Sequence, residues 1–166
     1  MNAGLFVLRL VAGLVLAAHG AQKLFGWFGG YGIAGTGGYF ETLGFRPGRA
    51  FAAAAAIAEC FGGLLMAAGW LGPVGPAVVL ATMIVAAVSV HWHNGLFATA
   101  NGIELPLLYA AVAAALALTG PGAYSLDAAL GHTAFWTPGL TWAALAIGVI
   151  GGAANLAARR PARVEA

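Results

Sequence analysis

Residues 50–71 read AFAAAAAIAECFGGLLMAAGWL, an apolar run with one carboxyl group, Glu59, near its middle. A helix needs about 20 mostly apolar residues to cross the hydrocarbon core of a bilayer, and this run is long enough. Its alanines and leucines lack the period-two alternation of a membrane β-barrel. The run also lacks the polar face of a helix in a soluble bundle. The stretch therefore predicts a transmembrane helix with a carboxyl group inside the membrane.

The composition extends this prediction to the whole chain. Hydrophobic residues make up 61% of the 166 residues and charged residues 7%, and the mean hydropathy is +0.90. Soluble domains carry roughly a quarter charged residues, so this chain could not cover a water-facing surface. The net charge is +2 without any basic stripe, so no nucleic-acid partner is expected. We predict an all-α, polytopic transmembrane helix bundle that forms one domain over residues 1–166, with the lipid bilayer as its partner.

Five stretches are apolar enough to span a membrane, although the fourth is short. Glycine residues at positions 148 and 152 form a GxxxG pair in the last stretch, which favours close helix packing within the bundle, with a homo-oligomer contact as the alternative. The Gly-rich, aromatic connection 29–48 predicts a flexible loop or a short amphipathic segment on the membrane interface. We expect a four-helix core plus a fifth C-terminal span, with the spans at residues 5–28, 50–71, 73–92, 102–119 and 138–158.

The positions of the basic residues predict the orientation. Lys and Arg concentrate in the cytoplasmic connections of membrane proteins. One cluster, Lys23, Arg46 and Arg49, lies around the connection between the first two spans, and a second, with Arg159, Arg160 and Arg163, follows the fifth span. Four crossings separate the clusters, so they share a side. We expect a bacterial cytoplasmic (inner) membrane, with the N-terminus outside and the C-terminus in the cytoplasm. Arg9 lies on the opposite side and should snorkel or face the bundle.

Ionisable residues inside the spans are the candidates for function, because they are costly there. Glu59 lies about 15 Å from either end of its span and must be protonated, paired or facing water. On the five-span topology, the other polar residues point to the cytoplasmic half of the bundle. The expected cluster contains His19, Lys23, Glu59, His91, His93 and Glu104, with Trp27 nearby as an aromatic surface.

Each of these residues also has a structural interpretation. Glu104 could be a first-turn carboxylate that favours the helix dipole, and Lys23 could snorkel to the surface. His19 and Glu59 could simply link two helices. His91, His93 and Glu104 suggest a transition metal, but residues two apart on a helix do not share a face, so no metal site is predicted. A haem between His19 and His91 is an equally weak alternative. A quinone matches better, because its carbonyls accept hydrogen bonds from His or Lys and its ring stacks on Trp27 or Trp92.

Short motifs give the chain a resemblance to the DoxX family of small bacterial membrane proteins. They are His19-Gly20-x-x-Lys23-Leu24-Phe25-Gly26, Glu59-x-x-Gly62-Gly63, His91, Glu104 and Gly120-Pro121-Gly122-x-x-Ser125-Leu126-Asp127. The resemblance covers roughly residues 5–130 and implies about four spans. It also implies that His19, Lys23, Glu59 and Glu104 are site residues, whereas Asp127 is structural. Members of the family include the large subunit of an archaeal thiosulfate:quinone oxidoreductase and mycobacterial proteins of a membrane-associated oxidative-stress complex.

From the residues and the resemblance together, we expect a membrane subunit associated with redox chemistry, quinone-linked and acting with redox partner proteins. His19 and Lys23 would bind the quinone head group, and Glu59 would relay protons. The sequence has a single cysteine, Cys60, and no flavin or iron–sulfur motif, so the electrons would have to come from a partner. The alternative is a non-catalytic membrane scaffold or small-molecule carrier.

Overall fold

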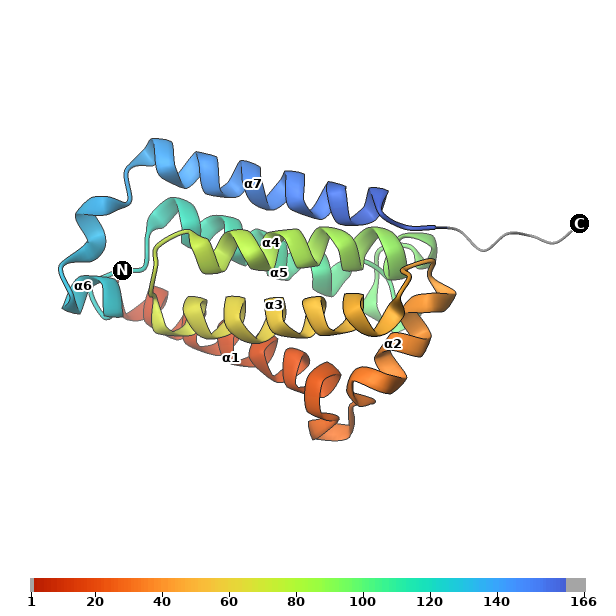
Figure 1. Cartoon of the computed structure of the whole chain (residues 1–166). Coiled ribbons are helices and arrows are strands. Elements are labelled where there is room, and N and C mark those ends of the chain that lie inside the picture. Colours follow the sequence, from red (N-terminus) through yellow and green to blue (C-terminus); the bar gives the residue numbers. More distant parts are fainter. Residues whose placement is uncertain (1, 161–166) are drawn as a thin grey trace, which may run out of the picture.

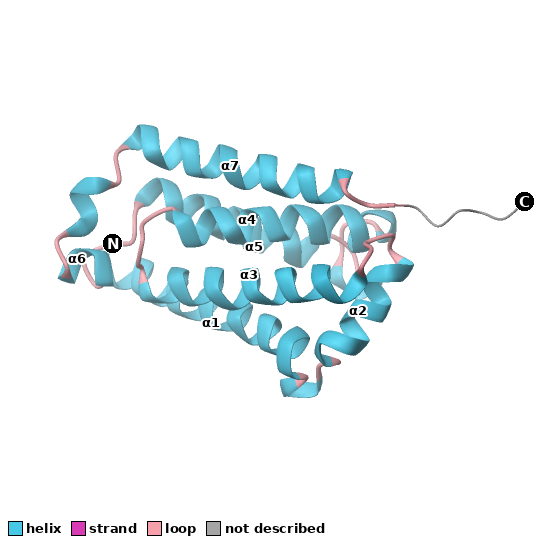
Figure 2. Cartoon of the chain, viewed as in Figure 1, coloured by secondary structure: helices cyan, strands magenta, loops and turns pink. Residues whose placement is uncertain are grey.

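The computed structural model describes residues 2–160, in which helices are joined by turns and no strand occurs (Figure 2). This confirms the predicted all-α class. Five longer helices run alongside one another with alternating direction (Figure 1). They are α1 (Asn2–Phe25), α3 (Gly48–Ala68), α4 (Val74–Ala86), α5 (Glu104–Thr119) and α7 (Pro138–Ala157).

Four of these helices are long and apolar enough to cross a membrane: α1, α3, α4 with its continuation to Asn94, and α7. The continuation consists of a π-helical turn, Ala87–His91, and a 3₁₀ turn, Trp92–Asn94. Helix α5 is shorter, with 16 residues and a rise of about 24 Å. Glycines end two of the helices earlier than predicted. Gly26 and Gly69 adopt positive φ angles of 75° and 63°, which L-residues with side chains rarely adopt.

The connection between α1 and α3 contains a helix, α2 (Gly32–Thr42), where the sequence predicted a loop or a short interfacial segment. Figure 1 shows α2 at the end of the bundle where α1 ends and α3 begins. Glu41 holds it there, since its Oε1 atom accepts a hydrogen bond of 3.1 Å from the Gly48 amide. The connection between α5 and α7 contains the short helix α6 (Leu126–Ala129) and a 3₁₀ turn, His132–Phe135.

Small residues let the helices approach closely. A Cβ added to Gly63 of α3 would lie 2.5 Å from the Gly13 carbonyl oxygen of α1. A Cβ on Gly148 of α7 would lie 2.5 Å from the Ala77 carbonyl oxygen of α4, and Gly152 packs one turn further along against α4. The GxxxG pair is therefore used within the bundle, as helix packing in lipid favours. The residues of the buried core are Ala12, Leu16, Met66, Val79, Met83, Ala113 and Leu116.

Two buried charges hold the turn between α3 and α4. Asp127 is fully buried, and its two oxygens accept hydrogen bonds from the amides of Leu71 (3.1 Å) and Gly72 (2.6 Å). Arg9, 2% exposed, donates from Nη1 to the Ala67 carbonyl oxygen at 2.6 Å. A cation is favourable there because the carbonyls at a helix C-terminus carry partial negative charge. Arg9 thus faces the bundle and does not snorkel.

The C-terminal end of α7 reaches the connection between α2 and α3. Arg159 Nε donates to the Leu43 carbonyl oxygen at 2.9 Å, and the Arg160 amide donates to the Gly44 carbonyl oxygen at 2.7 Å. The basic residues that follow α7 therefore lie at the same end of the bundle as Arg46 and Arg49 around the start of α3. Arg163, which the sequence analysis placed in the same cluster, lies outside the described residues.

Candidate functional site

A cavity of about 1090 Å³ lies between α3, α4 and α7, and α2 borders one end of it. Its walls are mostly small or apolar, with Ala54 and Ala58 on α3, Ala81 on α4 and Gly151 on α7. Large concave sites with apolar walls and a few polar groups are typical of small-molecule binding sites. Along α4 the lining continues from Val74 to His91, about 25 Å of helical rise, so a ligand here would lie at membrane depth.

Lys23 and Glu59 form an ion pair on this cavity. Lys23 reaches from the last turn of α1 and donates from Nζ to Glu59 Oε2. The Glu59 side chain is 5% exposed and that of Lys23 is 27% exposed, and both residues line the cavity. An ionised carboxylate inside a membrane needs such a partner. An ammonium group has three N–H donors, so Lys23 can serve the carboxylate and still donate to a ligand.

His91 lines the same cavity from the end of the π-helical turn. Its Nδ1 atom lies 2.7 Å from the carbonyl oxygen of Asn101 in the connection to α5. Ser89, two residues earlier, also lines the cavity. Lys23, Glu59 and His91 are thus the three predicted site residues that the fold brings to one cavity.

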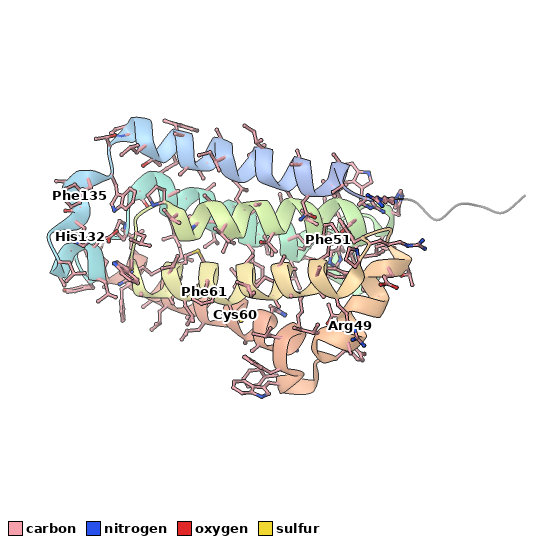
Figure 3. The ribbon with its side chains drawn as sticks, viewed as in Figure 1. Arg49, Phe51, Cys60, Phe61, His132 and Phe135 are labelled. Carbon is pink, nitrogen blue, oxygen red and sulfur yellow. The ribbon has the colours of Figure 1, made fainter. Side chains whose placement is uncertain are left out.

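Aromatic residues around α2 border the cavity, although they were not among the predicted site residues. The rings of Phe40 and Phe45 lie 5.7 Å apart between centroids, and Phe45 and Phe51 lie 5.2 Å apart. Tyr39 also lines this part. Figure 3 shows Phe51 near the α2 end of α3. The aromatic content of residues 29–48 was the signal that could have identified this part of the site.

His19 does not line the cavity. It is exposed, its Nδ1 atom lies 2.9 Å from Gln22 Oε1, and its ring lies edge-on to Tyr109 of α5, with centroids 6.5 Å apart. Residues four apart differ by about 40° around a helix. On α1 this offset turns His19 toward α5, while the longer side chain of Lys23 reaches α3. The predicted pairing of His19 with Lys23 at one head group is not seen.

The remaining predicted residues also lie away from the cavity. Glu104 Oε2 accepts a hydrogen bond of 2.7 Å from the Ala98 amide and so holds a loop. His93 is exposed, and Trp27 is 58% exposed and packs on Phe25. The predicted convergence is therefore partial. Within residues 2–160, no three His, Cys, Asp or Glu side chains are close enough together to hold a metal ion.

These features define an integral membrane protein with long apolar helices and an ion pair on an apolar cavity. The family model named DoxX matches residues 4–92, more than half of the chain, and the chain therefore belongs to the DoxX family. The matched region contains Lys23, Glu59 and His91, whereas Glu104 and the helices α5 and α7 lie beyond it. No curated protein and no solved structure matches the chain.

Proposed function

We propose that this protein is a membrane-embedded, redox-associated subunit that binds a quinone in the cavity and acts with a redox partner protein. The observation that carries the proposal is the Lys23–Glu59 ion pair on the wall of an apolar cavity of about 1090 Å³. A buried charged pair is costly in a membrane. Its place on a cavity suggests that it serves a ligand.

A quinone combines a flat ring and two carbonyl acceptors with an apolar tail, and the cavity has a counterpart for each part. Lys23 can donate to a carbonyl. The rings of Tyr39, Phe40 and Phe51 offer surfaces on which a flat ring can stack, and the alanines of α3 and α4 suit an apolar tail. His19 does not line the cavity and therefore does not contact the quinone in this binding mode.

Reduction of a quinone to its hydroquinone takes up two electrons and two protons. Glu59 is the carboxyl group in position to pass protons to the ligand, with Lys23 as its charge partner. The chain has one cysteine and so lacks the set of thiolates that an iron–sulfur cluster needs. The electrons would therefore come from the redox cofactor of the partner protein.

The alternative function is a non-catalytic scaffold or small-molecule carrier. One observation favours it: Lys23 and Glu59 satisfy each other and join α1 to α3. A structural ion pair would have the same geometry, and buried pairs of this kind can hold helices in register.

The two functions are separated by binding measurements on the full chain in lipid nanodiscs, with decylubiquinone as the probe. Gly151 lines the cavity, and a Cβ there meets no atom within 4 Å, so Gly151→Leu fills the cavity without disturbing helix packing. We expect it to weaken binding at least about tenfold. Gly139→Leu, an open position on the same helix outside the lining, should bind like the wild type.

Glu59→Gln should also weaken decylubiquinone binding by about tenfold, because the amide no longer holds Lys23 by charge. Loss of stability in Glu59→Gln together with unchanged binding in Gly151→Leu would favour the scaffold. A wild-type protein that does not bind decylubiquinone would refute the quinone proposal.

We also propose that the protein resides in the bacterial cytoplasmic membrane, with its N-terminus outside and its C-terminus in the cytoplasm. The support is the gathering of basic residues at one end of the bundle, where Arg159 and Arg160 contact the segment that precedes Arg46 and Arg49. Connections rich in Lys and Arg stay on the cytoplasmic side.

A further inference from the structure

We infer that His91 presents the lone pair of its Nε2 atom as a hydrogen-bond acceptor in the cavity, so that the site prefers a ligand with a hydroxyl group there. For the proposed ligand this means the hydroquinone form over the quinone. The inference rests on the proposed function and goes beyond it, because it predicts which redox state the site holds more tightly.

The tautomer of the ring follows from its partner. His91 Nδ1 lies 2.7 Å from the Asn101 carbonyl oxygen. A carbonyl oxygen can only accept, so the proton of this hydrogen bond must sit on Nδ1. In a neutral imidazole the other nitrogen then carries a lone pair and acts as an acceptor. Nε2 is therefore the ring nitrogen that remains available to a molecule in the cavity.

The Asn101 carbonyl is held firmly, which fixes the ring. It also accepts a hydrogen bond of 3.2 Å from Asn94 Nδ2. The loop that carries it is closed by backbone hydrogen bonds from Ile103 to Gly95 (3.0 Å) and from Glu104 to Leu96 (2.8 Å). This loop thereby sets the tautomer of a residue on α4, which is a positioning role for a segment outside the cavity.

The backbone of α4 is also irregular at this point. Residues Ala87–His91 form a π-helical turn, a local distortion that is frequent at functional sites. Ser89, inside the turn, donates to the Val85 carbonyl oxygen at 2.6 Å, so its hydroxyl is already engaged. Both Ser89 and His91 line the cavity. His91 is thus the group of this turn with a free acceptor nitrogen.

Lys23 and His91 then have opposite hydrogen-bonding roles in the cavity. Lys23 is a donor, whereas His91 is an acceptor with no proton to offer at Nε2. A quinone oxygen can only accept, so it pairs with Lys23 but not with His91. A hydroquinone carries two O–H groups and can donate to His91. The extra hydrogen bond predicts tighter binding of the reduced form.

Two substitutions separate this role from a purely structural one. In His91→Asn, the side-chain amide can take the place of Nδ1 and keep the bond to Asn101, but no atom replaces Nε2. In His91→Gln, the amide oxygen can reach the Nε2 position, while the bond to Asn101 is lost. The measurements are the affinities for decylubiquinol and decylubiquinone in nanodiscs and the midpoint of thermal unfolding.

We expect the wild type to bind decylubiquinol about tenfold more tightly than decylubiquinone, as one added hydrogen bond allows. His91→Asn should lose this preference while its unfolding midpoint stays close to that of the wild type. His91→Gln should keep part of the preference and unfold at a lower temperature. If His91 only holds the loop, His91→Asn will keep the full preference, and the inference is overturned.

Failure of this inference and failure of the proposed function give different results. The wild type could bind both forms equally while Gly151→Leu still weakens the binding of both. That result would refute the role of His91 but support the quinone site. Binding of neither form would remove the proposed function. If both His91 variants fail to fold, ¹⁵N spectra of the wild type still test the inference. The Nε2 signal should be that of an unprotonated nitrogen, and its chemical shift should change when decylubiquinol is added. An unchanged signal would overturn the inference.

Discussion

At the residue scale, the ion pair explains how a carboxyl group is tolerated in the middle of an apolar helix. Glu59 is nearly fully buried, whereas about a quarter of the Lys23 side chain is exposed. Lys23 can be partly exposed and still reach Glu59, because it lies in the last turn of α1, where a long side chain can bend into the bundle. The two partners therefore depend on each other unequally, since the carboxylate is the more buried of the two and Lys23 is the cation that pairs with it among residues 2–160.

In a double-mutant cycle, the two single variants should reveal this asymmetry and the double variant should reveal the coupling. Lys23→Met leaves a buried carboxyl group without its cation, and we expect a loss of about 3 kcal/mol of unfolding free energy. Glu59→Gln should cost less, because Lys23 can turn toward the polar end of the bundle. The loss of unfolding free energy in the double variant should be smaller than the sum of the two single losses by about 1 kcal/mol or more. Reversible unfolding in mixed micelles measures all three.

Arg46→Met serves as the control for this cycle, because Arg46 is an exposed cation at the same end of the bundle. Its effect should stay within about 0.5 kcal/mol. Strictly additive effects of Lys23→Met and Glu59→Gln would show that the two side chains are not coupled in the folded protein.

At the scale of elements, α7 completes the cavity although it lies beyond the region that the family model matches. Three of its glycines have two kinds of environment. Gly148 and Gly152 pack against α4, while Gly151 faces open space on the cavity side. Just beyond the end of the helix, Arg159 donates a hydrogen bond to the segment that joins α2 to α3. The same element thus provides a packing ridge and a cavity wall, and the residues that follow it contact the segment between α2 and α3.

Substitution on the packing ridge should separate α7 from α4. In Gly148→Leu the new Cβ would meet the Ala77 carbonyl oxygen at 2.5 Å, which is backbone and cannot move aside cheaply. We expect a loss of about 1–3 kcal/mol of unfolding free energy, as for other overpacked sites. Gly151→Leu carries the same side chain into open space and should be close to neutral. Equal stability of the two variants in the micelle assay would contradict the packing of α7 on α4.

At the scale of the whole molecule, the chain begins at one end of the bundle and its last helix ends at the other (Figure 1). An odd number of crossings, such as the proposed five, would produce this arrangement. The number of crossings depends on whether α5 crosses the bilayer, because its 16 residues are fewer than the roughly 20 that usually span one. It packs mainly beside α4, and the leucines near its two ends, such as Leu105 and Leu118, are half exposed.

Reporter fusions test the five crossings. A fluorescent protein that matures only in the cytoplasm should be bright when fused to the C-terminus of the full chain. Fused after Pro121, behind α5 and before α7, it should be dark, while alkaline phosphatase at the same point should be active. The reason is that basic residues are expected to keep their end of the bundle in the cytoplasm. Those at this end are Lys23, Arg46, Arg49, Arg159 and Arg160. The same reading at both positions would mean that α7 does not cross.

The sequence alone determined the class of protein, the number of long helices and most of their bounds. Transfer from water to lipid depends on the residues within one stretch, so the long apolar runs were enough to predict the helices. It also singled out Glu59, because a carboxyl group in mid-span is costly whatever surrounds it. The ends of α1 and α3 were predicted less well, since they depend on the backbone conformation of Gly26 and Gly69.

The tertiary structure decided which polar residues meet. Lys23, His19, Glu104 and His91 were all compatible with one cluster, yet Lys23 pairs with Glu59 while His19 faces α5 and Glu104 holds a loop. The rotation of each helix about its axis, and the choice of its neighbours, depend on close packing between glycines far apart in the chain, such as Gly13 with Gly63. Packing between distant segments also formed the cavity and brought the aromatic residues around α2 to it. No single stretch of sequence carries that information, because it exists only in the fit of one helix against another.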